Sequence, residues 1–217
     1  MTRFRAAIFD LDGVLADTAR AHFAAWKEIA DFLGIPFDEK ANEALKGIDR
    51  LGSLERILAS GGITLPEQEK QRLAAHKNDL YLEAVAALDP DELLLPGALP
   101  VVEAIRSAGL PSALASASRN APLILRRGGL GGLFDYVADP ARIASPKPAP
   151  DIFLDCASNL GVEAAFCVAF EDSVAGIDAI RAAGMRAIGI GAASALPLAD
   201  QVYATTSAVD VERVLAA

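Results

Sequence analysis

The stretch AAIFDLDG, residues 6–13, decides how this chain of 217 residues folds. Its apolar first half predicts a buried strand, and two carboxylates, Asp10 and Asp12, follow where that strand ends. Because side chains at positions i and i+2 of an extended segment lie on the same side, both acids are expected at the carboxyl edge of a sheet. Ligands bind at that edge in open parallel α/β sheets, and Gly13 lets the chain turn away sharply.

Beyond this strand, short apolar runs alternate with longer amphipathic segments from about residue 93 onward. The pattern is typical of repeated β-α units that build a parallel sheet. Strands are predicted at residues 6–10, 112–116, 136–138, 166–170 and 187–190, and helices at residues 98–108, 121–128, 150–160 and 174–183. The fold class is therefore α/β, with a Rossmann-like parallel sheet as its core and a helical insert.

That insert, residues 16–91, has long helical periodicity and no convincing strand. We expect a helical cap domain at 16–91 and an α/β core domain made of 1–15 and 92–217. The chain would cross between them near residues 14–16 and 90–96. Such a pair of crossings can act as a hinge, so we expect the cap to open and close over the core.

The composition limits the class of partner. With 20 Lys and Arg against 29 Asp and Glu, the net charge of -9 disfavours nucleic acid and anionic membranes. Cys156 and Cys167 belong to no CxxC pair and are expected to be buried free thiols. The first residues show no signal peptide, and the apolar stretch 187–198 is too short to span a bilayer, so a cytoplasmic monomer is expected.

Three further segments place polar side chains near the same predicted edge. Glu171 and Asp172 follow strand 166–170, Ser116 ends strand 112–116, and Lys147 stands between two prolines that stiffen its loop. Ionised carboxylates held close together repel one another unless a cation intervenes, and Mg²⁺ together with phosphate fits such oxygen ligands. Ser116 and nearby backbone N–H groups could hold that phosphate where the next helix starts.

Each of these segments also has a purely structural interpretation. A DxDG motif on its own is better read as a polar loop after a strand, and acids at 171–172 suit the start of a helix as caps. Ser118 suits a helix cap nearly as well as a phosphate contact. Lys147 could be an ordinary loop lysine, although its two prolines argue against that.

Taken together, the motifs DLDGVLADT (10–18), SASRN (116–120), SPKPAPD (145–151) and EDSVAGIDAI (171–180) resemble the haloacid dehalogenase superfamily of phosphotransferases. Within the insert, His22, Trp26, Ser53 and the runs LKGIDR (45–50) and HKND (76–79) are similar to the β-phosphoglucomutase-like subfamily. The resemblance covers essentially the whole chain. Two departures stand out: Asp49 replaces a small polar residue before Arg50, where its charge could weaken the hold on a phosphate, and Arg119 replaces a common lysine.

By this resemblance Asp10 is the nucleophile, Asp12 the general acid and base, and Ser116 and Lys147 hold the transferring phosphoryl group. Mg²⁺ would be bound by Asp10, the Asp12 main-chain carbonyl and Asp172, with Glu171 assisting. Arg50, Ser118, Arg119 and Asn120 would hold a second phosphate. The full implied substrate-binding set is Thr18, His22, Trp26, Lys46, Gly47, Ile48, Arg50, Ser53, Lys77, Ala117, Ser118, Arg119 and Asn120.

The activity that the resemblance implies is the interconversion of β-D-glucose 1-phosphate and glucose 6-phosphate. The reaction would pass through an aspartyl-phosphate enzyme and a 1,6-bisphosphate, which makes the protein a magnesium-dependent phosphotransferase of the isomerase class. Two alternatives stay open. One is a sugar-phosphate phosphatase with the same nucleophile, and the other is a non-catalytic module that binds Mg²⁺ or phosphate.

Overall fold

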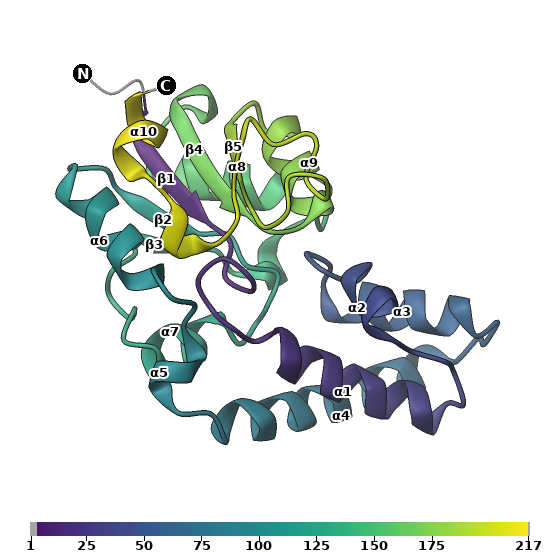
Figure 1. The fold of residues 1–217 in the computed structure, drawn as a ribbon. Coiled ribbons are helices and arrows are strands. Elements are labelled where there is room, and N and C mark those ends of the chain that lie inside the picture. The colour runs from purple at the N-terminus through teal and green to yellow at the C-terminus, as the bar shows by residue number, and fades with distance from the viewer. Residues whose placement is uncertain (1–3, 217) are drawn as a thin grey trace.

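Six parallel strands form one sheet, in the order β3-β2-β1-β4-β5-β6, in the computed structural model, which describes residues 4–216 (Figure 1). The central strand β1 pairs with β2 on one side and with β4 on the other. The ends of these three strands therefore lie next to one another. The strands are β1 Ala6–Phe9, β2 Ser112–Leu114, β3 Tyr136–Val137, β4 Cys167–Glu171, β5 Arg186–Ile190 and β6 Gln201–Tyr203.

Both faces of the sheet are buried, because its side chains alternate between two hydrophobic clusters. Ala7 and Phe9 belong to one cluster, and Ala6 and Ile8 belong to the other. The Phe9 ring stacks on Phe170 of β4, with ring centroids 4.6 Å apart. Burial on both faces explains why the strands appear in the sequence as continuous apolar runs.

Helices cover the two faces of the sheet. The cluster around Phe9 contains side chains of α6 Ala98–Ser107, α7 Ala121–Arg127 and α10 Val211–Ala216. The cluster around Ile8 contains side chains of α8 Asp151–Asn159 and α9 Val174–Ala182. Short 3₁₀ helices in the connections are η1 Pro140–Arg142, η2 Ala164–Phe166 and η3 Thr206–Ala208.

The insert after β1 is helical, as predicted. It consists of α1 Ala19–Phe32, α2 Glu39–Glu43, α3 Arg50–Ser60 and α4 Glu67–Ala86, and α5 Pro90–Leu93 follows it. Figure 1 shows α1 and α4 side by side, with α2 and α3 beyond them. These helices share a third hydrophobic cluster, which includes Trp26, Ile29 and Leu54. The boundaries 1–15, 16–91 and 92–217 stay predictions, and residues 1–3 and 217 lie outside the described part.

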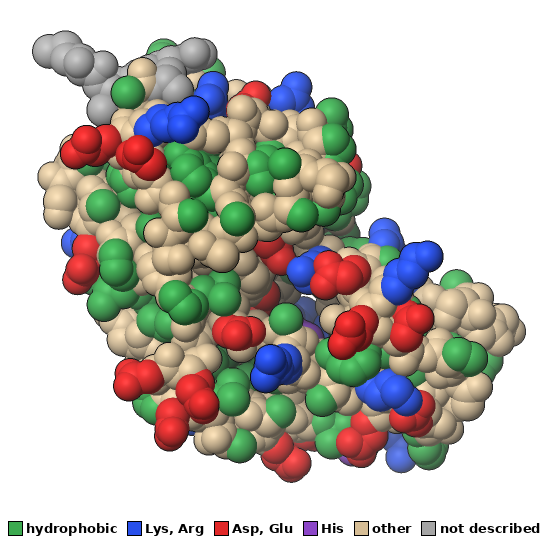
Figure 2. Space-filling view, in the orientation of Figure 1, with side chains coloured by type: hydrophobic (Ala, Val, Ile, Leu, Met, Phe, Trp, Pro, Cys, Tyr) green, Lys and Arg blue, Asp and Glu red, His purple; other side chains and the backbone are tan. Residues whose placement is uncertain are grey.

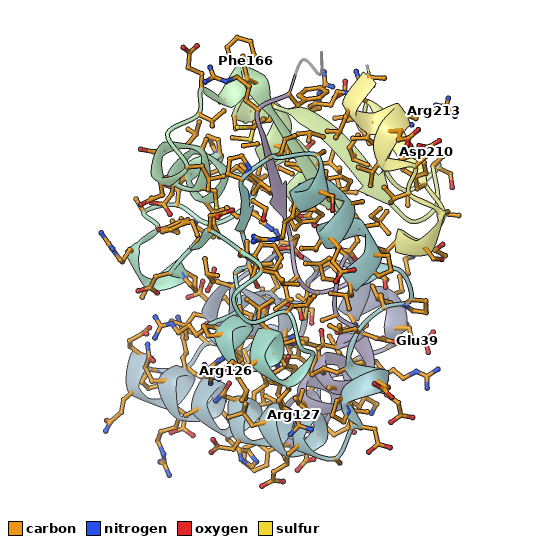
Figure 3. The ribbon with its side chains drawn as sticks, turned by 90° about the vertical axis from the view of Figure 1, so that its left-hand side faces the viewer. Glu39, Arg126, Arg127, Phe166, Asp210 and Arg213 are labelled. Atoms are coloured by element: carbon orange, nitrogen blue, oxygen red, sulfur yellow. The ribbon has the colours of Figure 1, made fainter. Side chains whose placement is uncertain are left out.

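The two chain crossings between sheet and cap helices run next to each other. The Leu95 N–H donates to the Leu15 carbonyl across them at 2.9 Å. A second link joins α7 to the end of α4, where the Arg127 guanidinium donates to the Leu88 carbonyl at 2.9 Å. Figure 3 labels Arg127 together with Arg126, at the end of α7. Movement about these crossings stays a prediction.

The structure confirms the α/β fold class and the five predicted strands, whose ends shift by one or two residues. Cys156 and Cys167 are buried free thiols, as predicted. The sequence did not indicate β6 or α10, because β6 is a three-residue edge strand, only half-buried, without a continuous apolar run. Within residues 4–216, no helix combines the length and the apolar character needed to cross a bilayer.

Candidate active site

A cavity of about 520 Å³ lies between the carboxyl edge of the sheet and the cap helices. Figure 2 shows it as a hollow with acidic and basic side chains around it. Its volume falls in the range of small-molecule sites. The predicted site residues that line it are Asp10, Asp12, His22, Trp26, Lys46, Gly47, Ile48, Arg50, Ser53, Lys77, Ala117, Ser118, Arg119, Asn120, Lys147 and Asp172. Thr18, Ser116 and Glu171 are buried and contact residues of this lining.

Lys147 joins two buried carboxylates at the floor of the cavity. Its ammonium donates to Asp10 Oδ1 at 2.6 Å and to Glu171 Oε2 at 2.8 Å. Burial disfavours the ammonium form, but the pKa of Lys147 is nevertheless raised because Asp10 and Glu171 stabilise its charge more strongly. Burial, together with the Glu171 charge, raises the pKa of Asp10 well above its usual range. Lys147 opposes that shift and so favours the ionised Asp10 carboxylate.

Three carboxylates meet beside this lysine. One oxygen from each of Asp10, Glu171 and Asp172 lies within 4.8 Å of the others. Burial and then the Glu171 charge raise the pKa of Asp172 to about 7. Lys46 reaches over from the cap, with its Nζ 3.1 Å from Asp172 Oδ2. An all-oxygen set of mutually repelling acids matches the ligand preference of Mg²⁺, so these residues fit the metal that the motifs predicted.

Glu171 is held by the start of α9. Its Oε1 accepts hydrogen bonds from the Asp172 N–H at 3.1 Å, and from the backbone N–H and the hydroxyl of Ser173. The helix approaches so closely that a Cβ on Gly176 would lie 2.0 Å from the Glu171 carboxylate. Glycine at position 176 is therefore a steric requirement of the buried acid, although its place in a helix normally favours alanine.

Gly176→Ala is expected to lower the free energy of unfolding by about 1–3 kcal/mol, because the new methyl group overpacks the Glu171 site. Urea unfolding followed by circular dichroism measures the loss. In a Glu171→Ala background the same methyl group meets an empty space, so the substitution should there be neutral or stabilising. Equal destabilisation in both backgrounds would contradict the steric account.

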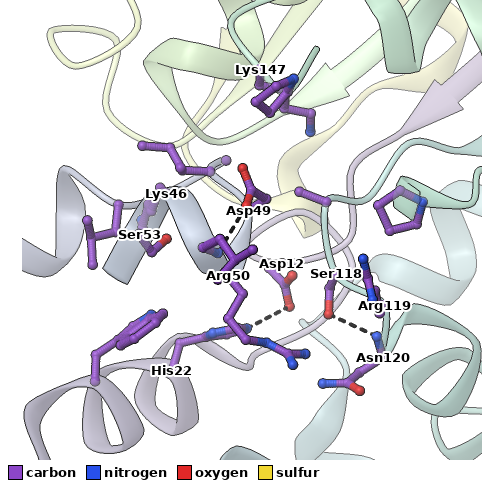
Figure 4. Close-up of a pocket in the computed structure, with 18 of the residues that line it drawn as sticks. Asp12, His22, Lys46, Asp49, Arg50, Ser53, Ser118, Arg119, Asn120 and Lys147 are labelled. Atoms are coloured by element: carbon purple, nitrogen blue, oxygen red, sulfur yellow. Dashed lines mark hydrogen bonds and ion pairs between the residues drawn. The ribbon is translucent and has the colours of Figure 1, made fainter. Parts of the chain in front are cut away.

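A second polar chain runs from the cap to Asp12. Lys77 Nζ lies 2.8 Å from His22 Nδ1, and His22 Nε2 lies 3.8 Å from Asp12 Oδ1 (Figure 4). Burial, with the nearby charges of Lys77 and Arg50, lowers the pKa of His22 well below its usual range, so the imidazole is neutral. With the Lys77 ammonium as donor, Nδ1 accepts, and the ring proton would then be on Nε2, the nitrogen nearer Asp12.

Asp12 is separate from the carboxylate cluster. The Thr18 hydroxyl donates to its Oδ1, on the side where His22 lies. Burial raises the pKa of Asp12, and the Thr18 hydrogen bond opposes the shift. A carboxyl group with a raised pKa and hydrogen-bonding partners of its own is suited to proton transfer.

Aromatic rings surround the Lys77 ammonium. Lys77 Nζ lies 4.9 Å from the centroid of the Trp26 ring and 4.8 Å from that of Tyr81. Burial, with the Arg50 charge, lowers the pKa of Lys77 to about 7. Trp26 also belongs to the hydrophobic cluster of the cap helices, so it is a core residue as well as part of the lining.

The opposite end of the cavity carries two guanidinium groups. Figure 4 shows Arg50 and Arg119 at the end remote from Lys147. Burial and then the Arg119 charge lower the pKa of Arg50. Within residues 4–216 neither arginine forms an ion pair with a carboxylate. Two like charges without a paired acid make this end a suitable place for an anion.

The serines before α7 take part in local turns. Ser118 Oγ accepts from the Asn120 N–H at 3.2 Å, and Ser116 Oγ accepts from the Ser118 N–H at 3.1 Å. Asn120, not Ser118, stands at the N-cap position of α7, so Ser118 forms a local turn and not the predicted helix cap. Each hydroxyl still has its own O–H to donate, so a phosphate contact stays compatible with these turns.

Asp49 caps α3. Its Oδ1 accepts from the N–H groups of Leu51 at 3.0 Å and Gly52 at 3.1 Å. The carboxylate thus faces the helix start, where it offsets unpaired N–H groups. Whether its charge also weakens the hold of Arg50 on an anion stays a prediction.

The motifs gave no separate role to several residues at this site. Asn42, Gln71 and the η1 residues Pro140 and Ala141 also line the cavity. Asn78 links Arg50 to Asn120 through hydrogen bonds. The motif run 76–79 includes Asn78 but assigned it no role, and its hydrogen bond to Asn120 depends on how the cap packs on the core.

Comparisons with known proteins found similarity over most of the chain. The family model of haloacid dehalogenase-like hydrolases matches residues 4–184. β-Phosphoglucomutase of Bacillus subtilis (strain 168) is 46% identical over 210 residues, which cover 96% of this chain and 92% of that protein. Fructose-1-phosphate phosphatase YqaB of Escherichia coli (strain K12) is 34% identical over 192 residues, which cover 87% and 97%. The crystal structure of β-phosphoglucomutase from Clostridium difficile superimposes with a TM-score of 0.93 at 39% identity, covering 97% of this chain and 95% of that one.

Proposed function

This chain belongs to the haloacid dehalogenase-like hydrolase family, and on that basis we propose that it interconverts β-D-glucose 1-phosphate and glucose 6-phosphate. The similarity to the Bacillus subtilis and Clostridium difficile β-phosphoglucomutases over nearly the whole chain supports this choice. The similarity to a fructose-1-phosphate phosphatase makes hydrolysis of a sugar phosphate the second candidate.

The observation that carries the proposal is the presence of cationic groups at both ends of one cavity. Lys147 lies beside Asp10, while Arg50 and Arg119 lie at the far end (Figure 4). A sugar that carries a phosphate at each end suits such a pair of positions, and a mutase must hold a bisphosphate in either orientation. A phosphatase needs only the position beside Asp10.

In this proposal the Asp10 carboxylate attacks one phosphorus of the sugar 1,6-bisphosphate, forms an aspartyl-phosphate and releases a sugar monophosphate. The ester oxygen leaves with a proton from Asp12, which later takes the proton from the hydroxyl group that receives the phosphoryl group. Lys147 and Ser116 would bind the transferring oxygens. Arg50, Arg119 and Asn120 would hold the phosphate that does not react. After the bisphosphate has turned round, that phosphate would lie beside Asp10 and be transferred to it.

The cap residues contribute by keeping water away from the phosphorylated Asp10. Lys46, Gly47 and Ile48 form a loop that already lies against the core, since a Cβ on Gly47 would come within 2.6 Å of Ser173 Oγ. His22 and Lys77, also from the cap, lie beside Asp12. If the cap closes only around a sugar phosphate, Asp12 would reach its catalytic position only when an acceptor hydroxyl is present.

Mg²⁺, held by Asp10, the Asp12 main-chain carbonyl and Asp172 with the assistance of Glu171, would offset negative charge on the transferring phosphoryl group. Adding Mg²⁺ at ~100 times its Kd is expected to raise the Tm by about 5–10 °C, through preferential binding to the folded state. In Asp172→Asn the rise should fall below half. Differential scanning calorimetry measures it, with Mg²⁺-free buffer as the baseline. An unchanged rise in the variant would remove Asp172 from the metal site.

A phosphorus NMR time course tests the proposed function. Wild-type protein with Mg²⁺, β-glucose 1-phosphate and a trace of glucose 1,6-bisphosphate should give glucose 6-phosphate, with little inorganic phosphate. Rapid release of inorganic phosphate without glucose 6-phosphate would instead support the phosphatase. A sample that does neither would favour the non-catalytic module.

A further inference from the structure

The side chain of Asn78, in α4, accepts two hydrogen bonds at a single oxygen atom. Its Oδ1 receives Arg50 Nη2 at 2.6 Å and Asn120 Nδ2 at 2.9 Å. Arg50 and Asn78 belong to the cap helices, whereas Asn120 precedes α7 of the core. One carboxamide oxygen therefore joins the two sides of the cavity.

This contact is unusual for a charged group such as the Arg50 guanidinium. Among residues 4–216, Arg50 forms no ion pair, and its short hydrogen bond goes to the Asn78 oxygen. Arg119 lies close enough to repel Arg50. A neutral oxygen thus holds a guanidinium that has a second positive group as its neighbour.

Arg50 and Asn120 line the cavity, and Asn78 lies behind them, outside the lining. Figure 4 shows the Arg50 guanidinium and the Asn120 side chain approaching each other. The Asn78 oxygen uses one N–H donor of each residue, so the remaining donors of Arg50 and Asn120 stay available to a phosphate in the cavity. We infer that Asn78 is a positioning residue that holds Arg50 and Asn120 in the arrangement needed for the second phosphate.

The choice of a carboxamide follows from this role. An aspartate has the same shape and also accepts hydrogen bonds, but its charge would neutralise Arg50 and repel an incoming phosphate. A carboxamide oxygen orients the same two donors without competing for their charge. Preorganised donors bind an anion more tightly because less side-chain freedom is lost on binding.

The inference rests on the proposed function in requiring a ligand with two phosphates. Substitution of Asn78 should therefore weaken only the binding of the second phosphate, since the Asn78 side chain bonds to Arg50 and Asn120 and not to Asp10 or Lys147. With β-glucose 1-phosphate, Asn78→Ala should raise KM about tenfold with kcat within about twofold, because binding geometry is lost and chemistry is not. Asn78→Asp should raise KM further.

Hydrolysis of acetyl phosphate provides the comparison, because this phosphodonor has no second phosphate. Both Asn78 variants should hydrolyse it at the wild-type rate. His76→Ala, an exposed position on the same helix, is the matched control and should change neither reaction. If Asn78 only packs α4 in place, Asn78→Asp should have wild-type kinetics, or its activity should fall equally with both substrates. Either result would overturn the inference.

Calorimetry separates this test from the proposed function. Magnesium-loaded wild type and Asn78→Asp are titrated with glucose 1,6-bisphosphate and with inorganic phosphate. Weaker binding of the bisphosphate alone supports the role of Asn78 even if no mutase activity exists. Equal weakening of both ligands, or none, rejects it.

Discussion

Asp10→Asn is expected to lower the rate of phosphoryl transfer by at least about 10⁴-fold, because the amide cannot act as the nucleophile. The fold should survive the change. Asp10 is buried beside two other acids and burial raises its pKa, so replacing its charge relieves repulsion while an oxygen can still face Lys147. Steady-state rates with β-glucose 1-phosphate measure the loss of activity, and a thermal melt shows whether the fold survives.

Asp17→Asn is the matched control, because Asp17 is an exposed acid seven residues further along the chain. It should keep the wild-type rate. A substantial rate in Asp10→Asn, freed of contaminating wild type, would mean that another group receives the phosphoryl group. That result would show that Asp10 is not the nucleophile.

Lys147→Ala should damage both stability and activity. Its side chain is 1% exposed, and its ammonium lies between Asp10 and Glu171. Removing one partner of a buried ion pair leaves uncompensated charge and typically costs about 3–5 kcal/mol of the free energy of unfolding. The loss of a preorganised cation next to the transferring group should also lower kcat by about 10²–10³-fold.

Lys27→Ala is the control for this variant. Lys27 pairs with Asp31 at 2.5 Å, but both side chains are largely exposed, so the pair should contribute less than about 1 kcal/mol. Guanidinium chloride unfolding compares the two variants on one scale. Similar losses for Lys147→Ala and Lys27→Ala would show that Lys147 does not stabilise the buried acids.

The fold and the floor of the site could be predicted because their signals are local. A buried parallel strand must be apolar along its length, and a polar residue at its end must lie at the sheet edge, so Asp10, Asp12 and Asp172 could be placed from sequence alone. Lys147 could be singled out because prolines flank it. The structure brings Asp10, Lys147, Glu171 and Asp172 into direct contact, or within 4.8 Å of one another.

The rest depends on contacts between distant segments. Asn78 meets Arg50 and Asn120 across 28 and 42 residues of sequence, and no spacing rule connects them. The interpretation of Asp49 needed the helix start that its carboxylate caps. Such features follow from how the cap packs on the core, which the sequence motifs do not describe.

Trapping the phosphorylated enzyme tests the central claim most directly. Wild-type protein is mixed with Mg²⁺, β-glucose 1-phosphate and a trace of glucose 1,6-bisphosphate, quenched in acid, digested with pepsin and analysed by tandem mass spectrometry. The account predicts that peptides containing Asp10 gain the mass of one phosphoryl group, which fragment ions assign to Asp10 and not to Asp12. A phosphoryl group on any other residue, or product formation with no phosphorylated peptide, would contradict it.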